Sequence, residues 1–155
     1  MPKTSAALLL FRRRDGLEVL IAHMGGPFWA RKDARAWSIP KGEYTDEEPL
    51  AAARREFAEE LGSPPPDGDA IDLGVVTQSS GKVVTTYAIE SDFDLAGFRS
   101  NTFELEWPKG SGRVQEFPEV DRAEWVPEPV AREKLVKGQV PVLDALLEHL
   151  EGSNR

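Results

Sequence analysis

The chain has 155 residues, of which 40% are hydrophobic and 30% charged, and its formal net charge is −8. This composition is typical of a soluble globular protein, and we expect a single domain over residues 1–155. The chain has no cysteine, which excludes disulfides and thiolate chemistry, and its two histidines are too few for a zinc site. The acidic balance argues against binding to nucleic acid. No apolar run approaches membrane-spanning length, so we expect a cytoplasmic protein that does not bind a membrane.

Three strands are predicted in the first part of the chain. The first two cover residues 5–12 and 17–23, and the Asp-Gly pair at residues 15–16 between them is a strong hairpin signal. A short third strand is predicted over residues 37–39, where Pro40 ends it.

The segment between the second and third strands, residues 28–35, is predicted to be an exposed loop. It contains Trp29 beside the cations Arg31 and Lys32. An aromatic ring beside cations can stack on a nucleotide base and hold a phosphate. Trp29 can equally close the hydrophobic core, and the sequence leaves both roles open.

The third strand leads through a loop into a helix. Gly42 permits the backbone to approach a ligand or a metal closely, and Lys41 offers a positive charge for a phosphate. The helix is predicted to begin at Pro49, because the first helical position does not need a backbone N–H. An alanine-rich sequence continues it, and Gly62 is predicted to end it.

Two faces of this helix differ in chemistry. One is an apolar stripe for the core, formed by Leu50, Ala53, Phe57 and Leu61. Another gathers three carboxylates, those of Glu56, Glu59 and Glu60. Like charges one turn apart repel, and a hard divalent cation such as Mg²⁺ would turn this repulsion into binding. A solvated acidic face is the alternative.

Beyond the helix, the predicted strands and helices are interleaved irregularly. The strands cover residues 72–79, 82–92, 113–117 and 124–126, with a turn at Ser80 and Gly81 between the first two. The helices cover residues 130–136 and 140–151. This order predicts an α+β fold with a mixed sheet.

Residues 91–112 are predicted to be an irregular excursion with at most one short strand. Long loops in compact domains usually carry function or are mobile. Glu104 and Glu106 alternate there as residues on one face of a strand do. Either glutamate can supply a further metal ligand or the general base, or can face solvent.

The stretch from Gly42 to Gly62 resembles the signature of the Nudix hydrolases. That signature is a glycine, five residues, a glutamate, seven residues, and then Arg-Glu-apolar-x-Glu-Glu-x-Gly-apolar. Residues 55–62 match its second half, and counting back seven residues from Arg55 gives Glu47 as the isolated glutamate. With Glu47, four residues separate the glycine from the glutamate, one fewer than in the signature. With Glu48, that first spacing is five as in the signature, but the spacing from the glutamate to Arg55 is one residue short. Ser63 stands where an apolar residue is expected, and the Trp-Ser-Ile-Pro-Lys lead-in at residues 37–41 is a weaker likeness.

The resemblance implies a Nudix α/β/α sandwich around a mixed central sheet, with the helix packed on the sheet by its apolar face. It also implies Mg²⁺, or Mn²⁺ in its place, as the cofactor. The implied metal ligands are Glu56, Glu59, Glu60 and a backbone carbonyl at Lys41 or Gly42.

The resemblance further implies how the carboxylates divide their work. One of the metal-binding glutamates, or a glutamate from a later loop, would deprotonate the attacking water, and Glu47 would assist. Arg55 can pair with Glu59 one turn along the helix and hold the cluster in shape.

The predicted function is therefore Mg²⁺-dependent hydrolysis of a phosphoanhydride bond in a nucleoside polyphosphate, such as a nucleoside triphosphate or a dinucleoside polyphosphate. A non-catalytic Nudix-like module that binds a nucleotide is the alternative. The expected partner is a small phosphorylated nucleotide, and a homodimer is left open. The residues expected to contact the substrate are Lys41, Trp29, Arg31, Lys32, Glu104 and Glu106.

Overall fold

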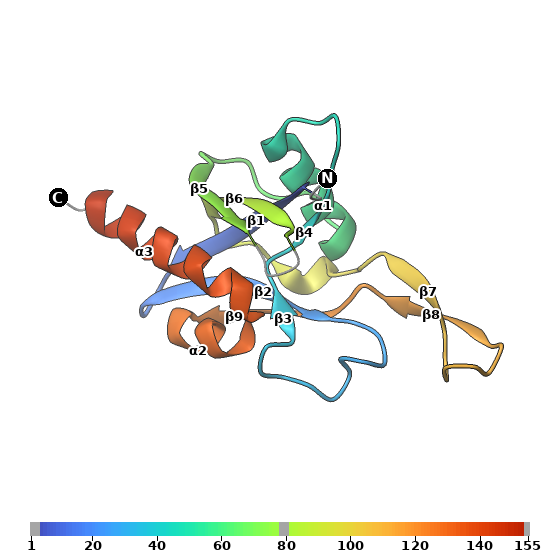
Figure 1. Ribbon diagram of the computed structural model, residues 1–155. Coiled ribbons are helices and arrows are strands. Elements are labelled where there is room, and N and C mark those ends of the chain that lie inside the picture. Colours follow the sequence, from blue (N-terminus) through green and yellow to red (C-terminus); the bar gives the residue numbers. More distant parts are fainter. Residues whose placement is uncertain (1–3, 78–80, 154–155) are drawn as a thin grey trace.

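Figure 1 shows the computed structural model of the chain, which describes residues 4–77 and 81–153. Within these residues, seven strands form a main sheet and two form a separate sheet. The strands are β1 (Thr4–Arg13), β2 (Leu17–Met24), β3 (Trp37–Ser38), β4 (Lys41–Glu43), β5 (Ile71–Thr77), β6 (Val83–Glu90), β7 (Thr102–Glu106), β8 (Val114–Pro118) and β9 (Val120–Pro127). The helices are α1 (Pro49–Leu61), α2 (Glu128–Lys134) and α3 (Val140–Ser153), with 3₁₀ turns η1 (Leu95–Gly97) and η2 (Lys137–Gln139). None of the helices in these described ranges is long and apolar enough to cross a membrane.

Strand β1 lies inside the main sheet and pairs with strands on both sides. It runs antiparallel to β2 and parallel to β6, and the strand order is β3-β2-β1-β6-β5. Strand β4 pairs with β1 just before α1, and β9 pairs with β2. One parallel pair among antiparallel pairs makes this a mixed sheet, as the sequence predicts. The predicted hairpin between β1 and β2 is also confirmed, and Gly16 in its turn has a φ of +121°.

Helices cover both faces of the main sheet, which confirms the α/β/α arrangement (Figure 1). On one face, Phe57 and Leu61 of α1 pack against alternate residues of β1 and are fully buried. On the other face, Leu143 and Leu146 of α3 pack against the remaining residues of β1. Because both faces are covered, β1 is an almost continuous apolar run instead of an alternating one.

Helix α1 begins and ends where the sequence predicts. Pro49 is its first residue, and Gly62 closes it with a φ of +79° and an N–H that donates to Ala58 O at 2.8 Å. A Cβ atom at Gly62 would lie 2.3 Å from Arg99 O, so glycine is required there both for its conformation and for space. Of the predicted apolar stripe, Leu50 is only half-buried while the others are buried.

The one short strand predicted within residues 91–112 is present as β7, whose pairing the sequence did not predict. Strand β7 pairs antiparallel with β8, with Phe103 opposite Phe117. The resulting hairpin projects from the main sheet (Figure 1). The alternating pattern of β7 was present in the sequence, but its partner strand lies beyond a turn rich in glycine and proline that obscures the pairing.

Two smaller differences concern the edges of the sheet. Residues 41–43, predicted to be loop, form β4, because β1 offers them an unpaired edge to bond with. Strand β9 has eight residues where three were predicted, because charged side chains interrupt its apolar pattern. The predicted turn residue Ser80 and the strand end at residues 78–79 lie outside the described residues.

Candidate functional site

Strand β4 and helix α1 meet at Gly42 and Glu56. A Cβ atom at Gly42 would lie 1.9 Å from Cδ of Glu56, so the Glu56 carboxylate occupies the space that any other residue at position 42 would fill. Close approach at Gly42 is thus made by a carboxylate of α1. The side chain of Glu56 is 14% exposed, and burial raises the pKa of its carboxyl group even though Arg55 acts in the opposite direction.

The guanidinium of Arg55 is the centre of a carboxylate cluster. Its Nε lies 2.9 Å from both carboxylate oxygens of Glu47, and its Nη1 donates to Glu56 Oε1 at 2.8 Å. The predicted pair with Glu59 also forms, with Nη1 3.3 Å from Glu59 Oε2. Hydrogen bonding to Arg55 lowers the pKa of Glu47. Arg55 therefore contacts Glu47 and not Glu48, which supports the alignment that keeps the helix in register.

Glu60 lies on the same helix but in a different environment. Its Oε2 accepts a hydrogen bond from the backbone N–H of Lys41 at 3.3 Å. Burial is the main reason that the pKa of Glu60 rises to about 8, and the nearby carboxylates of Glu119 and Glu56 raise it further. The two ends of the acidic face thus differ: Glu59 pairs with the partly exposed guanidinium of Arg55, whereas Glu60 is half-buried and bonds to a backbone N–H.

The three predicted metal ligands are not gathered into a metal cage. Among residues 4–77 and 81–153, no three acidic or histidine side chains converge as metal ligands do. The reason is that Glu56 and Glu59 turn toward Arg55, while Glu60 turns toward the backbone of Lys41.

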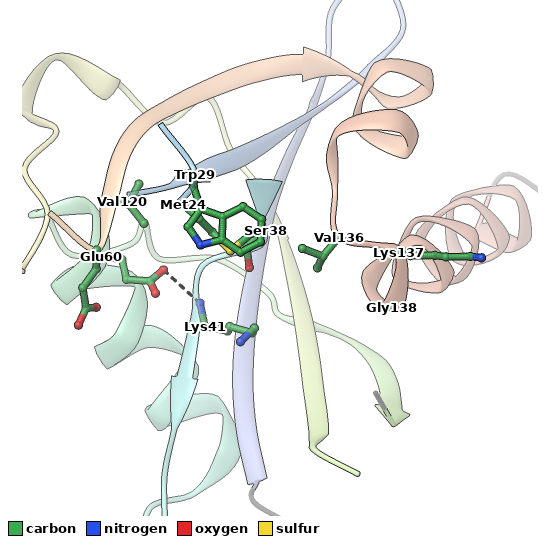
Figure 2. Close-up of a pocket in the computed structure, with 10 residues that line it drawn as sticks. Met24, Trp29, Ser38, Lys41, Glu60, Val120, Val136, Lys137 and Gly138 are labelled. Atoms are coloured by element: carbon green, nitrogen blue, oxygen red, sulfur yellow. Dashed lines mark hydrogen bonds between the residues drawn. The ribbon is translucent and has the colours of Figure 1, made fainter. Parts of the chain in front are cut away.

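A cavity of about 480 Å³ adjoins Glu60. The residues that line it are Met24, Trp29, Ser38, Lys41, Glu60, Glu119, Val120, Val136, Lys137 and Gly138. Figure 2 shows the Trp29 indole near the middle of this cavity, with Glu60 on one side and Gly138 on the other. An aromatic ring among apolar side chains, with a few charged groups around them, is the usual character of a small-molecule site.

The structure places Trp29 both against the core and at the cavity, while stacking on a base stays a prediction. Trp29 is half-buried and packs against the core on the α3 side of the sheet, and it also lines the cavity. Lys32 Nζ lies 5.3 Å from the centre of the indole ring. Arg31 is exposed and is not among the residues that line the cavity.

The later glutamate that faces the cavity is not one of the two predicted. Glu104 lies opposite Glu116 in the projecting hairpin, and Glu106 Oε1 accepts from the backbone N–H of Gly110 at 2.6 Å. Neither lines the cavity, so the structure does not bring them to the carboxylates of α1. Glu119, immediately before β9, lines it instead. The sequence did not indicate this residue, because Glu119 reaches the cavity only after β7 and β8 pair and bring the chain back to the main sheet.

A second missed residue is Lys82, beside Lys41. The pKa of Lys41 is lowered first by burial and then by the positive charge of Lys82, which itself lies 3.5 Å from Glu43 Oε1. The two lysines meet because β4 and β6 flank the same stretch of β1. No local pattern in the sequence indicates this pairing.

Comparison with known proteins gives one decisive match. A sequence model of the NUDIX domain matches residues 1–146. The chain belongs to the Nudix family. Curated protein sequences give no match.

Several solved structures share the fold of this chain. The NUDIX domain of Shewanella oneidensis NrtR, complexed with ADP ribose, is 19% identical with a TM-score of 0.65 over 97% of this chain and 89% of that one. An Ap4A hydrolase from C. elegans, solved as a binary complex, is 18% identical with a TM-score of 0.64 over 96% and 98%. The C-terminal domain of mouse MUTYH, in complex with human PCNA, is 18% identical with a TM-score of 0.61 over 97% and 91%.

The Nudix signature is one residue short in this chain, and the structure shows how that is accommodated. The missing residue falls between β4 and α1, outside both elements. Glu47 still reaches Arg55 with both carboxylate oxygens. The second departure, Ser63, is half-buried and follows the closing Gly62, so it changes no residue of α1.

Proposed function

We propose that the chain is a Mg²⁺-dependent hydrolase that cleaves a phosphoanhydride bond in a nucleoside polyphosphate. The observation that carries this proposal is a cavity with Trp29 at its middle and the half-buried Glu60 at one side, next to the Arg55 carboxylate cluster of a Nudix helix. Family membership supports it, as do neighbours solved as an Ap4A hydrolase and as a complex with ADP ribose. Binding of nucleic acid is not expected, and that expectation stays a prediction.

The donor chemistry of the site fits a hard cation. Glu56, Glu59, Glu60 and Glu119 supply only carboxylate oxygens, which Mg²⁺ and Mn²⁺ accept as ligands and which a structural zinc site rarely uses alone. Glu60 is buried close to the like charges of Glu56 and Glu119, an arrangement that a divalent cation stabilises. A carbonyl at Lys41 or Gly42 would add a further oxygen. When bound, Mg²⁺ neutralises charge on the phosphates and lowers the pKa of a water ligand.

The remaining steps belong to residues of the chain itself. Arg55 holds Glu47 and Glu56 in place, while its longer contact to Glu59, at 3.3 Å, leaves that side chain the least restrained of the three. Glu59 and Glu119 are the two candidates to accept the proton of the attacking water. The Lys41 ammonium would bind a phosphate of the substrate.

Trp29 and its loop would hold the other end of the substrate. The indole ring would stack on the nucleotide base, which places the phosphate chain toward Glu60 and Lys41. Arg31 and Lys32, both exposed, would act at longer range by attracting the anionic substrate.

A direct test is incubation with a panel of nucleoside triphosphates, dinucleoside polyphosphates and ADP-ribose in the presence of Mg²⁺, with product measured by chromatography and phosphate release. We expect turnover of at least one substrate and its loss on addition of EDTA. The double variant E59Q/E60Q should be folded and inactive. The matched control E48Q changes an exposed glutamate beside the cluster and should retain activity. An inactive wild-type protein, or a fully active E59Q/E60Q variant, would overturn the proposal.

One observation favours a second candidate, a nucleotide-binding module that does not catalyse hydrolysis. Arg55 engages three carboxylates at once, and the described residues form no ready-made metal cage. In that case the protein would bind a nucleotide tightly and release no product at any concentration of Mg²⁺ or Mn²⁺. Calorimetric binding measured beside the turnover assay separates the two candidates.

A further inference from the structure

His23, near the end of β2, connects the Trp29 loop to strand β9. The side chain is fully buried. Its Nδ1 lies 2.7 Å from Asp121 Oδ1 on β9, and its Nε2 lies 2.6 Å from the backbone carbonyl of Lys32. The ring also packs edge-on against Trp37 with 5.1 Å between centroids. The imidazole is therefore fixed on three sides.

The carbonyl that His23 holds belongs to a turn that carries Trp29. Within that turn the N–H of Lys32 donates to Trp29 O at 2.9 Å, and the N–H of Trp29 donates to Gly26 O at 3.2 Å. The described loop contains no helix or strand between β2 and β3. Further along the loop, Trp37 Nε1 donates to Asp33 Oδ1 at 2.9 Å. Within residues 26–32, the bond to His23 ties the carbonyl of Lys32, whose N–H is bonded to Trp29, to a buried side chain.

The contact of His23 with Asp121 fixes the direction of its contact with Lys32. Asp121 Oδ1 lies within hydrogen-bonding distance of one ring nitrogen, and this contact orients the ring so that the other nitrogen faces the Lys32 carbonyl. Asp121 lies on β9, two residues after Glu119, and Arg122 on the same strand is paired opposite His23 in the sheet. One imidazole thereby links the loop that carries the indole to the strand that follows the cavity-lining glutamate.

We propose that His23 is a positioning residue that holds Trp29 in place to receive the nucleotide base. This inference rests on the proposed function, because Trp29 matters only if the cavity binds a nucleotide. His23 does not line the cavity and does not touch the substrate. Its loss would loosen the Trp29 turn and weaken nucleotide binding, while the carboxylates of α1 would keep their places.

The kinetic test compares the only two histidines of the chain, His23 and His149. We expect H23Q to raise KM by about tenfold or more while kcat stays within about threefold, because a binding contact and not the chemical step is affected. The matched control H149Q alters an exposed residue of α3 and should change neither constant. A fall in kcat with unchanged KM, or an H23Q variant that behaves like H149Q, would overturn the proposal.

A second measurement does not depend on turnover. In hydrogen–deuterium exchange of the wild-type and variant proteins, H23Q should speed the exchange of amides in residues 26–32 and leave those of α1 unchanged. D121A removes the orienting contact from a side chain that is 30% exposed, so it tests the same link with less risk to folding. It should speed exchange in the same loop.

These two measurements separate failure of the inference from failure of the proposed function. If the wild-type protein hydrolyses no nucleotide, the proposed function fails, and exchange in residues 26–32 still decides whether His23 fixes the loop. If turnover is present but neither H23Q nor D121A changes KM or loop exchange, only the role of His23 is overturned.

Discussion

Glu59 and Glu60 are neighbours on one helix, yet their surroundings differ. Glu59 lies at the partly exposed Arg55 cluster, where one guanidinium contacts three carboxylates. Glu60 lies beside the cavity, where burial raises its pKa to about 8 and a backbone N–H is its hydrogen-bond partner. The comparison teaches that helical spacing brings carboxylates together, while the elements packed on each side decide how deeply each one is buried and which group it bonds to.

We expect the largest effect on activity from a change of Glu60. E60Q should lower kcat/KM by about 100-fold or more, because it removes an oxygen donor from the site where the cation is proposed to bind. Steady-state kinetics with Mg²⁺ measures this effect. E148Q, a change of an exposed glutamate on α3, is the control and should leave kcat/KM unchanged. An E60Q variant with near wild-type activity would place the metal elsewhere.

A change at Gly42 tests whether activity depends on the position of Glu56, which lies between the Arg55 cluster and Glu60. The Cβ of G42A would lie 1.9 Å from Glu56 Cδ, so the carboxylate must move away from β4. We expect kcat/KM to fall by about tenfold or more, the size of effect seen when groups that orient metal ligands are lost. G152A is the matched control, since a Cβ at Gly152 meets no atom within 4 Å. Equal activity of both variants would show that Glu56 need not be fixed.

At the exposed end, Glu47 and Glu48 form a natural pair for comparison. E47Q removes the charge from the partner of Arg55 and should lower kcat/KM by up to about tenfold. E48Q alters the residue before α1, which makes no side-chain cap, and should have little effect. If E48Q were the damaging change, the alternative alignment of the signature would be correct.

The smallest expected effect is on stability as pH changes. The pKa of Glu60 in the folded protein, about 8, lies above its unfolded value near ~4.3. Its contribution to stability is therefore complete at acidic pH and is lost as pH rises toward and through 8. Thermal unfolding without divalent cations should show Tm falling by several degrees over this range, and E60Q should reduce that fall. An identical pH dependence in both proteins would contradict a raised pKa for Glu60.

Much of the fold and part of the site follow from local sequence patterns. The bounds of α1 depend on Pro49 and Gly62, and the pairing of Arg55 with Glu59 depends on helical spacing. The first hairpin depends on its Asp-Gly turn. These features were predictable because each is governed by residues within a few positions of one another.

Other features of the site could not be read from the sequence. Glu104 and Glu106 had the alternation expected of a strand, but the chain needed a hairpin and a return to β9 before Glu119 reached the cavity. Lys82 reaches Lys41 only because two strands flank β1. The two contacts of His23 join three separate segments: strand β2, the loop at Lys32 and strand β9 at Asp121.

The sequence by itself therefore determined the carboxylate helix, its register and the family to which the chain belongs. The tertiary structure decided which carboxylate is buried, which later glutamate lines the cavity, and what holds Trp29 in place. The physical reason is range: helix ends and same-face spacing are set by short-range backbone geometry, whereas burial and charge depend on residues far apart in the chain that only the folded sheet brings together.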